Sequence, residues 1–191
     1  HFIAQSLKFD TSYNINNLEP IANWGADPAV LIVPADSPFN SAADLVAWSK
    51  ANPGKLTVSG AGLFVGHHIA SLQLDKAANI STKYIPAPGG GVAALKMVLG
   101  SQVKAGFNNL SDAYRQGDRI KILAVADNQR DENFLPYVPT FKEQGIDIDD
   151  SSVNFRGIMA RKGTPPEVLE FLAERVHLMF QDGKVAGKMK A

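Results

Sequence analysis

Two glycine-rich turns are the segments of this sequence whose residue types could bind an anion. The first glycine turn, residues 59–66, has the sequence SGAGLFVG, and the second glycine turn, residues 86–91, has the sequence PAPGGG. Small residues let a ligand approach the backbone, and the unpaired N–H groups of a following helix favour negative charge. We therefore predict that both turns hold an anion. The alternative for each turn alone is tight packing between a strand and a helix without a ligand.

Two histidines and two asparagines are the polar residues expected nearest to these turns. His67 and His68 directly follow the first glycine turn, and Asn108 and Asn109 follow a later predicted strand. Open α/β sheets bind ligands outside the carboxyl ends of their strands, so all these segments are expected to line one crevice. The predicted ligand-binding residues are Ser59, Gly60, Ala61, Gly62, Gly66, His67, Pro86, Gly89, Gly90, Gly91, Asn108 and Asn109.

The adjacent histidines do not form a metal site. Neighbouring residues on a helix point about 100° apart, so His67 and His68 cannot share a metal as an i, i+4 pair would. No zinc motif is present elsewhere in the sequence. We predict no metal, and we expect one histidine to face the crevice while the other packs or is solvated.

No residues have the pattern of a catalytic acid, base and nucleophile. Ser59 lacks the G-x-S-x-G context of a nucleophilic serine. The Gly60-x-Gly62 spacing suggests dinucleotide binding, but it is loose, and the next predicted strand ends in Ile85-Pro86 where an acidic residue would bind the ribose. We predict no catalytic residue and no cofactor. A nucleotide-dependent α/β enzyme that binds phosphate through this turn is the alternative hypothesis, and a ligand-sensing lobe of a regulator is a third.

The composition excludes several classes of protein. The 191 residues include 19 lysines and arginines against 19 aspartates and glutamates, without a basic run, so no nucleic-acid partner is predicted. No apolar stretch approaches the roughly 20 residues of a membrane-spanning helix, so we do not expect a membrane protein. Cysteine is absent, which excludes disulfides and thiol chemistry but is compatible with either side of a bacterial membrane.

Short apolar runs alternate with helix-like segments through the middle of the chain. This alternation predicts an α/β fold with a parallel or mixed sheet covered on both faces by helices. The sequence after residue 126 becomes polar and proline-containing, as in a connection between lobes. We therefore predict a central α/β ligand-binding lobe over residues 30–126, with residues 1–29 as part of a first lobe and residues 127–191 returning to it. The predicted strands are residues 30–33, 55–59, 82–85, 103–107, 120–126 and 153–159.

Several motifs together resemble one protein family, the extracytoplasmic solute receptors of tripartite tricarboxylate transporters, also called the Bug family. They occur in family order over nearly the whole chain. The matching segments are LEPIA at 18–22, ANPGKL at 51–56, SGAG at 59–62 with His68 beginning the next helix, YIP at 84–86, VPTFKEQG at 138–145, RGIMA at 156–160 and GTP at 163–165.

The resemblance implies a periplasmic binding protein of the type II-like, two-lobed kind. Such a receptor closes on a small organic carboxylate, whether a di-, tri- or aromatic carboxylate, and delivers it to the membrane permease subunits of the transporter without catalysis. Ligands of the family are bound by backbone-rich loops and bridging waters, with one strand-to-helix loop from each lobe. Carried over to this chain, the central-lobe loop is residues 59–67, and Phe155 reaches the cleft from the returning segment.

The chain departs from the family pattern in two places. Members of the family have a further N-terminal portion with a glycine-rich loop of the first lobe, and nothing here matches it. The first residues, HFIAQ, resemble neither an initiator region nor a signal peptide, so we expect that an upstream portion is missing. Asn108 and Asn109 stand where the family commonly has small or acidic residues, which suggests a polar, uncharged ligand end at this position.

Overall fold

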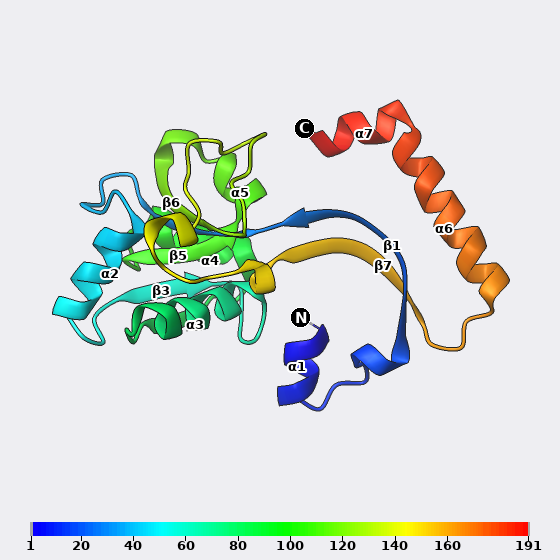
Figure 1. Ribbon diagram of the computed structural model, residues 1–191, viewed down its shortest axis with the longest axis horizontal. Helices are drawn as coiled ribbons and strands as arrows, with labels where there is room; N and C mark the ends of the chain where they lie inside the picture. Colours follow the sequence, from blue (N-terminus) through cyan, green and yellow to red (C-terminus); the bar gives the residue numbers. More distant parts are fainter. Residues whose placement is uncertain (1, 191) are drawn as a thin grey trace. The chain divides into compact units, whose positions relative to one another are not determined.

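The computed structural model describes residues 2–190, which form two compact units (Figure 1). Unit 1 is the continuous stretch Asp27–Asn154, and unit 2 combines Phe2–Ala26 with the residues from Phe155 onward. The chain passes from unit 2 into unit 1 at the end of strand β1 and returns at the start of strand β7. No helix in the described part of the chain is long and apolar enough to span a membrane.

Unit 1 is built on a five-stranded sheet with the order β4-β3-β5-β2-β6. Strand β2 is antiparallel to both β5 and β6, whereas β3 is parallel to β4 and β5. The prediction of an α/β fold with a parallel or mixed sheet is thus confirmed, and the sheet is mixed. The strands are β2 (Ala29–Pro34), β3 (Thr57–Gly60), β4 (Lys83–Pro86), β5 (Ala105–Asn109) and β6 (Ile120–Ala126), and the helices of unit 1 are α2 (Ala42–Ala51), α3 (Gly66–Ala78), α4 (Gly90–Leu99) and α5 (Leu110–Tyr114), with short 3-10 turns at Gly117–Arg119, Lys142–Gln144 and Asp150–Ser152.

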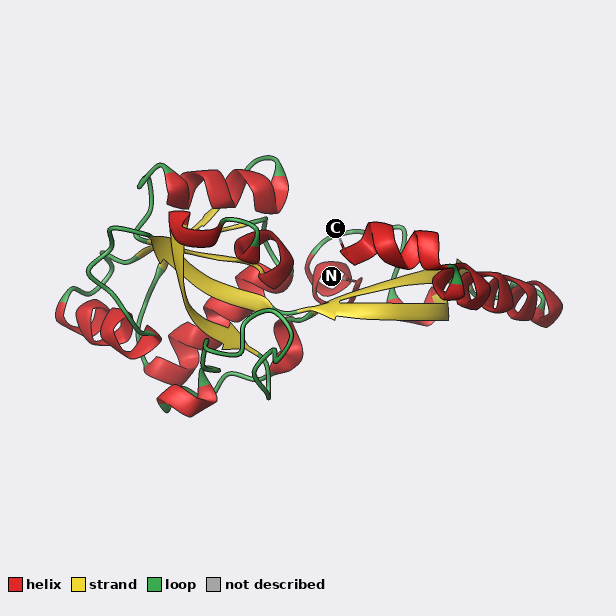
Figure 2. Ribbon diagram, turned by 90° about the horizontal axis from the view of Figure 1, so that it is seen from above, coloured by secondary structure: helices red, strands yellow, loops and turns green. Residues whose placement is uncertain are grey.

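The interior strand β2 explains why both faces of this sheet are covered by helices (Figure 2). Its sequence AVLIVP is apolar throughout, and successive side chains of a strand point to opposite faces. Leu31 and Val33 join one buried cluster with residues of α2 and α3, while Val30 and Ile32 join a second with residues of α4 and α5. The sheet therefore separates two cores.

Unit 1 extends beyond the boundary predicted at residue 126, and this expectation is corrected. The segment 127–154 begins with polar residues, but it then contributes Phe141, Ile146 and Ile148 to the core that contains Leu31. The rings of Phe141 and Phe107 lie 6.1 Å apart between centroids. Because these apolar side chains dock against the sheet, the segment belongs to unit 1 and is not a connection between lobes.

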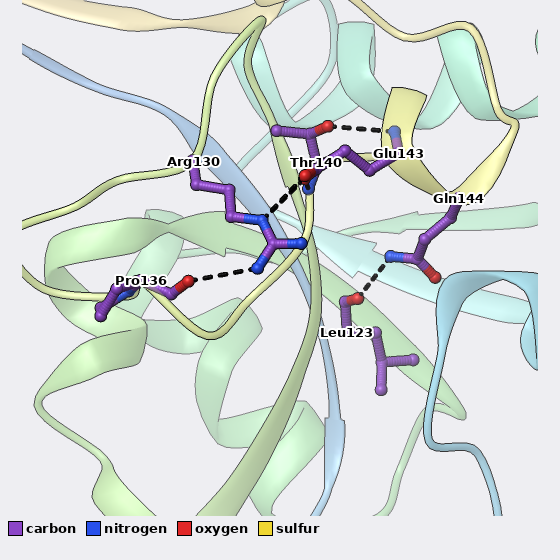
Figure 3. Close-up of polar contacts among 6 residues, drawn as sticks. All are labelled: Leu123, Arg130, Pro136, Thr140, Glu143 and Gln144. Carbon is purple, nitrogen blue, oxygen red and sulfur yellow. Dashed lines mark hydrogen bonds and ion pairs between the residues drawn. The ribbon is translucent and has the colours of Figure 1, made fainter.

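Polar contacts hold the same segment against the sheet (Figure 3). The Gln144 side chain donates to the Leu123 carbonyl at 2.8 Å and accepts from the Ala42 backbone N–H at 2.8 Å, so it joins β6 to the start of α2. Arg130 Nε donates to both carboxylate oxygens of Glu143 at 2.9 Å, and this hydrogen bonding lowers the pKa of Glu143. The Arg130–Glu143 pair is solvent-exposed and adds little stability, whereas the Gln144 bonds satisfy backbone groups of the sheet and helix.

In its described residues, unit 2 contains a two-stranded sheet and three α-helices. Strand β1 (Leu18–Asp27) pairs with strand β7 (Asn154–Arg161). The strand predicted from the sequence at residues 153–159 corresponds to β7. Helix α6 has no buried residue, and large apolar side chains such as Phe171 and Leu172 are exposed. The helices are α1 (Phe2–Lys8), α6 (Pro166–Gln181) and α7 (Gly183–Lys190), with a 3-10 turn at Ile15–Asn17.

Candidate ligand-binding site

The predicted anion-binding segments meet at one edge of the unit 1 sheet. Strands β4, β3 and β5 are parallel neighbours, so their carboxyl ends lie together, and one of the predicted segments begins at the end of each strand. Hydrogen bonds connect all three segments: the Ala87 N–H donates to the Gly60 carbonyl at 2.8 Å, Asn108 Nδ2 to the Gly91 carbonyl at 2.9 Å, and His67 Nε2 lies 2.9 Å from Asn109 Oδ1.

His67 is a buried link between the first glycine turn and β5. It lies in the first turn of α3 with only 2% of its surface exposed. Its Nδ1 accepts from the Ala61 backbone N–H at 3.1 Å, and its Nε2 faces Asn109 Oδ1. Burial lowers the pKa of His67, and this effect outweighs the raising effects of the Asn109 hydrogen bond and of the Asp112 and Asp27 carboxylates. The imidazole is therefore neutral near pH 7.

His68 holds the other end of the first glycine turn, a role that the sequence analysis did not assign. Its Nδ1 accepts from the Phe64 backbone N–H at 3.0 Å, and its ring lies 4.4 Å from that of Tyr84. Tyr84 in turn donates its hydroxyl to the Gly62 carbonyl at 2.9 Å, and burial raises the pKa of Tyr84 to about 12. The turn is thus fixed by side chains on α3 and β4.

The acceptor role of both histidines predicts a pH dependence. Burial lowers the pKa values of His67 and His68 below their ordinary 6.5, so the unfolded chain binds these protons more readily than the folded chain. Their contribution to the free energy of unfolding is then fully present above pH 6.5 and is lost as the pH falls through the folded pKa values. Urea unfolding between about pH 5 and pH 8 should show this loss of stability on the acid side.

The matched control for the pH prediction is the double variant His67→Asn, His68→Asn. An asparagine oxygen can occupy the position of Nδ1 and accept the same backbone N–H without titrating. The variant should therefore show a flatter dependence of stability on pH than the native chain. An unchanged pH dependence would mean that other groups dominate the titration.

Two glycines of the first glycine turn are required by packing. A Cβ at Gly60 would overlap the Tyr84 hydroxyl and lie 2.9 Å from the Cβ of His67. A Cβ at Gly66 would lie 2.5 Å from the Ser152 carbonyl oxygen. At these two positions the structure gives glycine a packing role that needs no ligand.

Other glycines of the two turns are open. A Cβ at Gly62 would meet only Val65, at 4.0 Å, and one at Gly90 would meet nothing within 4 Å. Gly89 and Gly90 have φ angles of 102° and 80°, which side chains rarely adopt. In the described residues, the backbone N–H groups of Gly62, Gly66, Gly89 and Gly91 have no hydrogen-bond partner. Gly62, Gly89 and Gly91 are at least partly exposed, so their N–H groups are available to an anion, whereas Gly66 is buried.

Some predicted site residues are placed differently from the open glycines. The Ser59 side chain is fully buried, and its hydroxyl donates to the Ala94 carbonyl at 3.0 Å, so it serves the packing of α4 on β3. Pro86 ends β4 and is exposed. Phe155 belongs to unit 2, where it is 52% exposed. It lines a hollow of about 670 Å³ within that unit, together with other residues of β1 and β7.

The edge combines neutral hydrogen-bond donors with two nearby carboxylates. The charged groups that act on His67 are the carboxylates of Asp112 and Asp27. Asp27 accepts from the Ser111 N–H at 3.1 Å and from the Ser111 hydroxyl at 2.6 Å, so its charge is partly compensated. Among the described residues, no group of three or more histidines and acids could hold a metal ion.

Comparison with known proteins gives consistent results. The chain matches the family described as "Tripartite tricarboxylate transporter family receptor" over residues 2–182. A Cupriavidus necator protein, "UPF0065 protein in gbd 5'region", is 31% identical over 170 residues, which cover 87% of this chain and 51% of the relative. The chain spans about half the length of the curated relatives it matches.

Solved structures agree with this family match. The crystal structure of a TctC solute binding protein from Polaromonas, with no ligand, is 27% identical with a TM-score of 0.77, covering 98% of this chain and 64% of that one. MatC from Rhodopseudomonas palustris with bound malate is 21% identical with a TM-score of 0.81, covering 95% and 62%, which shows a shared fold. The resemblance and the periplasmic-binding-protein fold predicted from the motifs are confirmed: the chain belongs to the receptor family of the tripartite tricarboxylate transporters.

Proposed function

We propose that this chain is the ligand-binding part of a periplasmic receptor that captures a small organic carboxylate and delivers it to membrane permease subunits. The observation that carries the proposal is the set of unpaired and at least partly exposed backbone N–H groups of Gly62, Gly89 and Gly91, on two linked turns. Family membership supports the transport role, and the malate bound to MatC, which has the same fold, supports a carboxylate as the ligand.

Hydrogen bonds from these backbone N–H groups would contribute substantially to the free energy of binding an anion. A hydrogen bond to a charged acceptor contributes about 1.5 to 3 kcal/mol, and each helix N-terminus adds about 0.3 to 1 kcal/mol toward an anion. The turns precede α3 and α4, so both kinds of contribution act at the same edge. Two or three such bonds would provide much of the roughly 8 kcal/mol that micromolar affinity requires.

We infer that the protein binds without a catalytic step. The hydroxyl of Ser59 is committed to the Ala94 carbonyl, and His67 uses both ring nitrogens in structural hydrogen bonds. Neither group is available as a nucleophile or a general base in this arrangement. The glycine turns then act as a binding surface alone.

Thermal stabilisation by small carboxylates tests this function. A ligand at 100 times its dissociation constant should add about 2.7 kcal/mol to the stability of the folded protein. The panel should contain malate, adipate, citrate and benzoate, with nicotinamide and adenine nucleotides alongside. We expect stabilisation by one carboxylate class and none by the nucleotides. Stabilisation by nucleotides alone would instead support the nucleotide-dependent enzyme.

A further inference from the structure

We propose that Asn109 is a specificity-determining residue that presents its side-chain NH₂ group, and not its carbonyl oxygen, to a carboxylate of the ligand. His67 is the positioning residue that sets this orientation. The proposal rests on the proposed function, because it assigns a particular ligand contact within the same site. It follows from three consecutive steps, each of which depends on hydrogen bonds between described residues.

The first step concerns the proton on His67. A neutral imidazole has one nitrogen that accepts and one that donates. The Ala61 backbone N–H can only donate, and it lies 3.1 Å from Nδ1, so Nδ1 is the acceptor. The proton must therefore be on Nε2, which donates to the atom that it faces, Asn109 Oδ1 at 2.9 Å.

The second step concerns the amide of Asn109. Its Oδ1 accepts from His67 Nε2 and also from Asn154 Nδ2, at 2.7 Å, so both acceptor positions of this oxygen are occupied. A flipped amide would direct its NH₂ group at the N–H of His67, and two donors would oppose each other. The orientation of the Asn109 side chain is thus determined by the imidazole.

The third step concerns the free end of that amide. Asn109 is half-buried at the end of β5, and within the described part of the chain its Nδ2 has no hydrogen-bond partner. The neighbouring Asn108 differs, because its Nδ2 donates to the Gly91 carbonyl and its Oδ1 accepts from the Asn109 N–H. Asn108 is also fully buried, so of the two asparagines only Asn109 can present donors to a ligand.

The ligand chemistry follows from this arrangement. Two amide hydrogens at the edge match a group with acceptor oxygens, and a carboxylate forms the strongest such bond. A ligand group that can only donate, such as an ammonium, would meet two donors and be rejected. In this chain, an aspartate at position 109 would present an anionic oxygen in place of the NH₂ group and would weaken the binding of a carboxylate at this position.

Titration calorimetry on the full-length protein with malate and adipate tests the proposal through Asn109→Asp. This variant keeps an oxygen that can accept from His67 and Asn154, so it should fold, but it should bind either acid about tenfold to a hundredfold more weakly. The matched control is Asn40→Asp, which adds the same charge. Asn40 lies in the loop after β2, and because β2 is antiparallel to β5, this loop is at the opposite edge of the sheet from Asn109. The Oδ1 atom of Asn40 already accepts from Lys121 Nζ at 2.9 Å. This control should bind like the native protein.

Variants at His67 test the positioning role. His67→Leu removes the donor to Asn109 and should weaken binding, whereas the amide NH₂ of His67→Gln can reach the position of Nε2 and should restore most of the affinity. Loss of affinity in His67→Leu without restoration by glutamine would show that the imidazole only supports the fold, and would overturn the positioning role.

The outcomes separate this proposal from the proposed function. If the native protein binds a dicarboxylate and Asn109→Asp binds it equally well, the assignment of Asn109 is wrong while the receptor function stands. If the native protein binds no carboxylate, both are wrong. Should Asn109→Asp fail to fold, the side-chain ¹⁵N resonance of Asn109 in the native protein decides: a shift on adding malate supports the contact, and no shift overturns it.

Discussion

The Gly62→Val variant should lose carboxylate binding completely while keeping a stability close to that of the native protein. Gly62 is the open position of the first glycine turn, where a Cβ would meet only Val65 at 4.0 Å. It does not have a positive φ, so valine can adopt its backbone conformation. The valine methyl groups would occupy the space beside the unpaired N–H groups and keep an anion from approaching them.

Calorimetry and urea unfolding of the same samples separate these two effects. Binding of malate or adipate should fall by more than about a hundredfold, which is more than 2.7 kcal/mol, with the unfolding midpoint nearly unchanged. Gly183→Val is the matched control, because a Cβ added at Gly183 would meet nothing within 4 Å. Gly183 lies in unit 2, at the start of α7. Native affinity in Gly62→Val would exclude the first glycine turn from the site.

The Phe141→Ala variant should destabilise unit 1 by about 3 to 5 kcal/mol, the cost of deleting a buried aromatic side chain and leaving a cavity. Phe141 is fully buried and packs against Phe107 of β5. The prediction tests the assignment of the segment 127–154 to the core of unit 1. In a connection between lobes, the same truncation would have little effect on the free energy of unfolding.

Tyr137→Ala provides the comparison within the same segment, because Tyr137 is 91% exposed. Its effect on the free energy of unfolding should stay within about 0.5 kcal/mol. Equilibrium urea unfolding, followed by the fluorescence of Trp48, which packs against the same core, measures both variants. Equal effects of the two substitutions would contradict the structure of this segment.

Much of unit 1 could be predicted because its strands are short apolar runs between clear turn residues. The strand predicted at 120–126 is the observed β6, Ile120–Ala126. Strand β5 was predicted at 103–107 but is Ala105–Asn109, since the polar Asn108 and Asn109 pair with Val30 and Ala29. Apolar periodicity alone cannot reveal a strand whose last two residues are asparagines.

The candidate site was predictable in its local parts but not in its connections. The glycine turns are visible in the sequence because each follows a strand and precedes a helix. The bonds from His67 to Asn109 and from Asn154 to Asn109 join residues far apart in the chain, and no spacing rule indicates them. For the same reason, the sequence does not indicate that the Ser59 hydroxyl donates to the distant Ala94 carbonyl.

The division of the chain between its units has a consequence for the order of folding. Unit 1 is one unbroken stretch, whereas unit 2 combines the two ends, so β7 leaves the ribosome only after all of unit 1 has been synthesised. Once unit 1 has folded, Asp27 is hydrogen-bonded to Ser111 and Asn154 is hydrogen-bonded to Asn109. Ser111 and Asn109 are only two positions apart in the sequence. The base of β1 and the base of β7 are then already adjacent, and the entropy of closing that long loop has been compensated before the two strands pair.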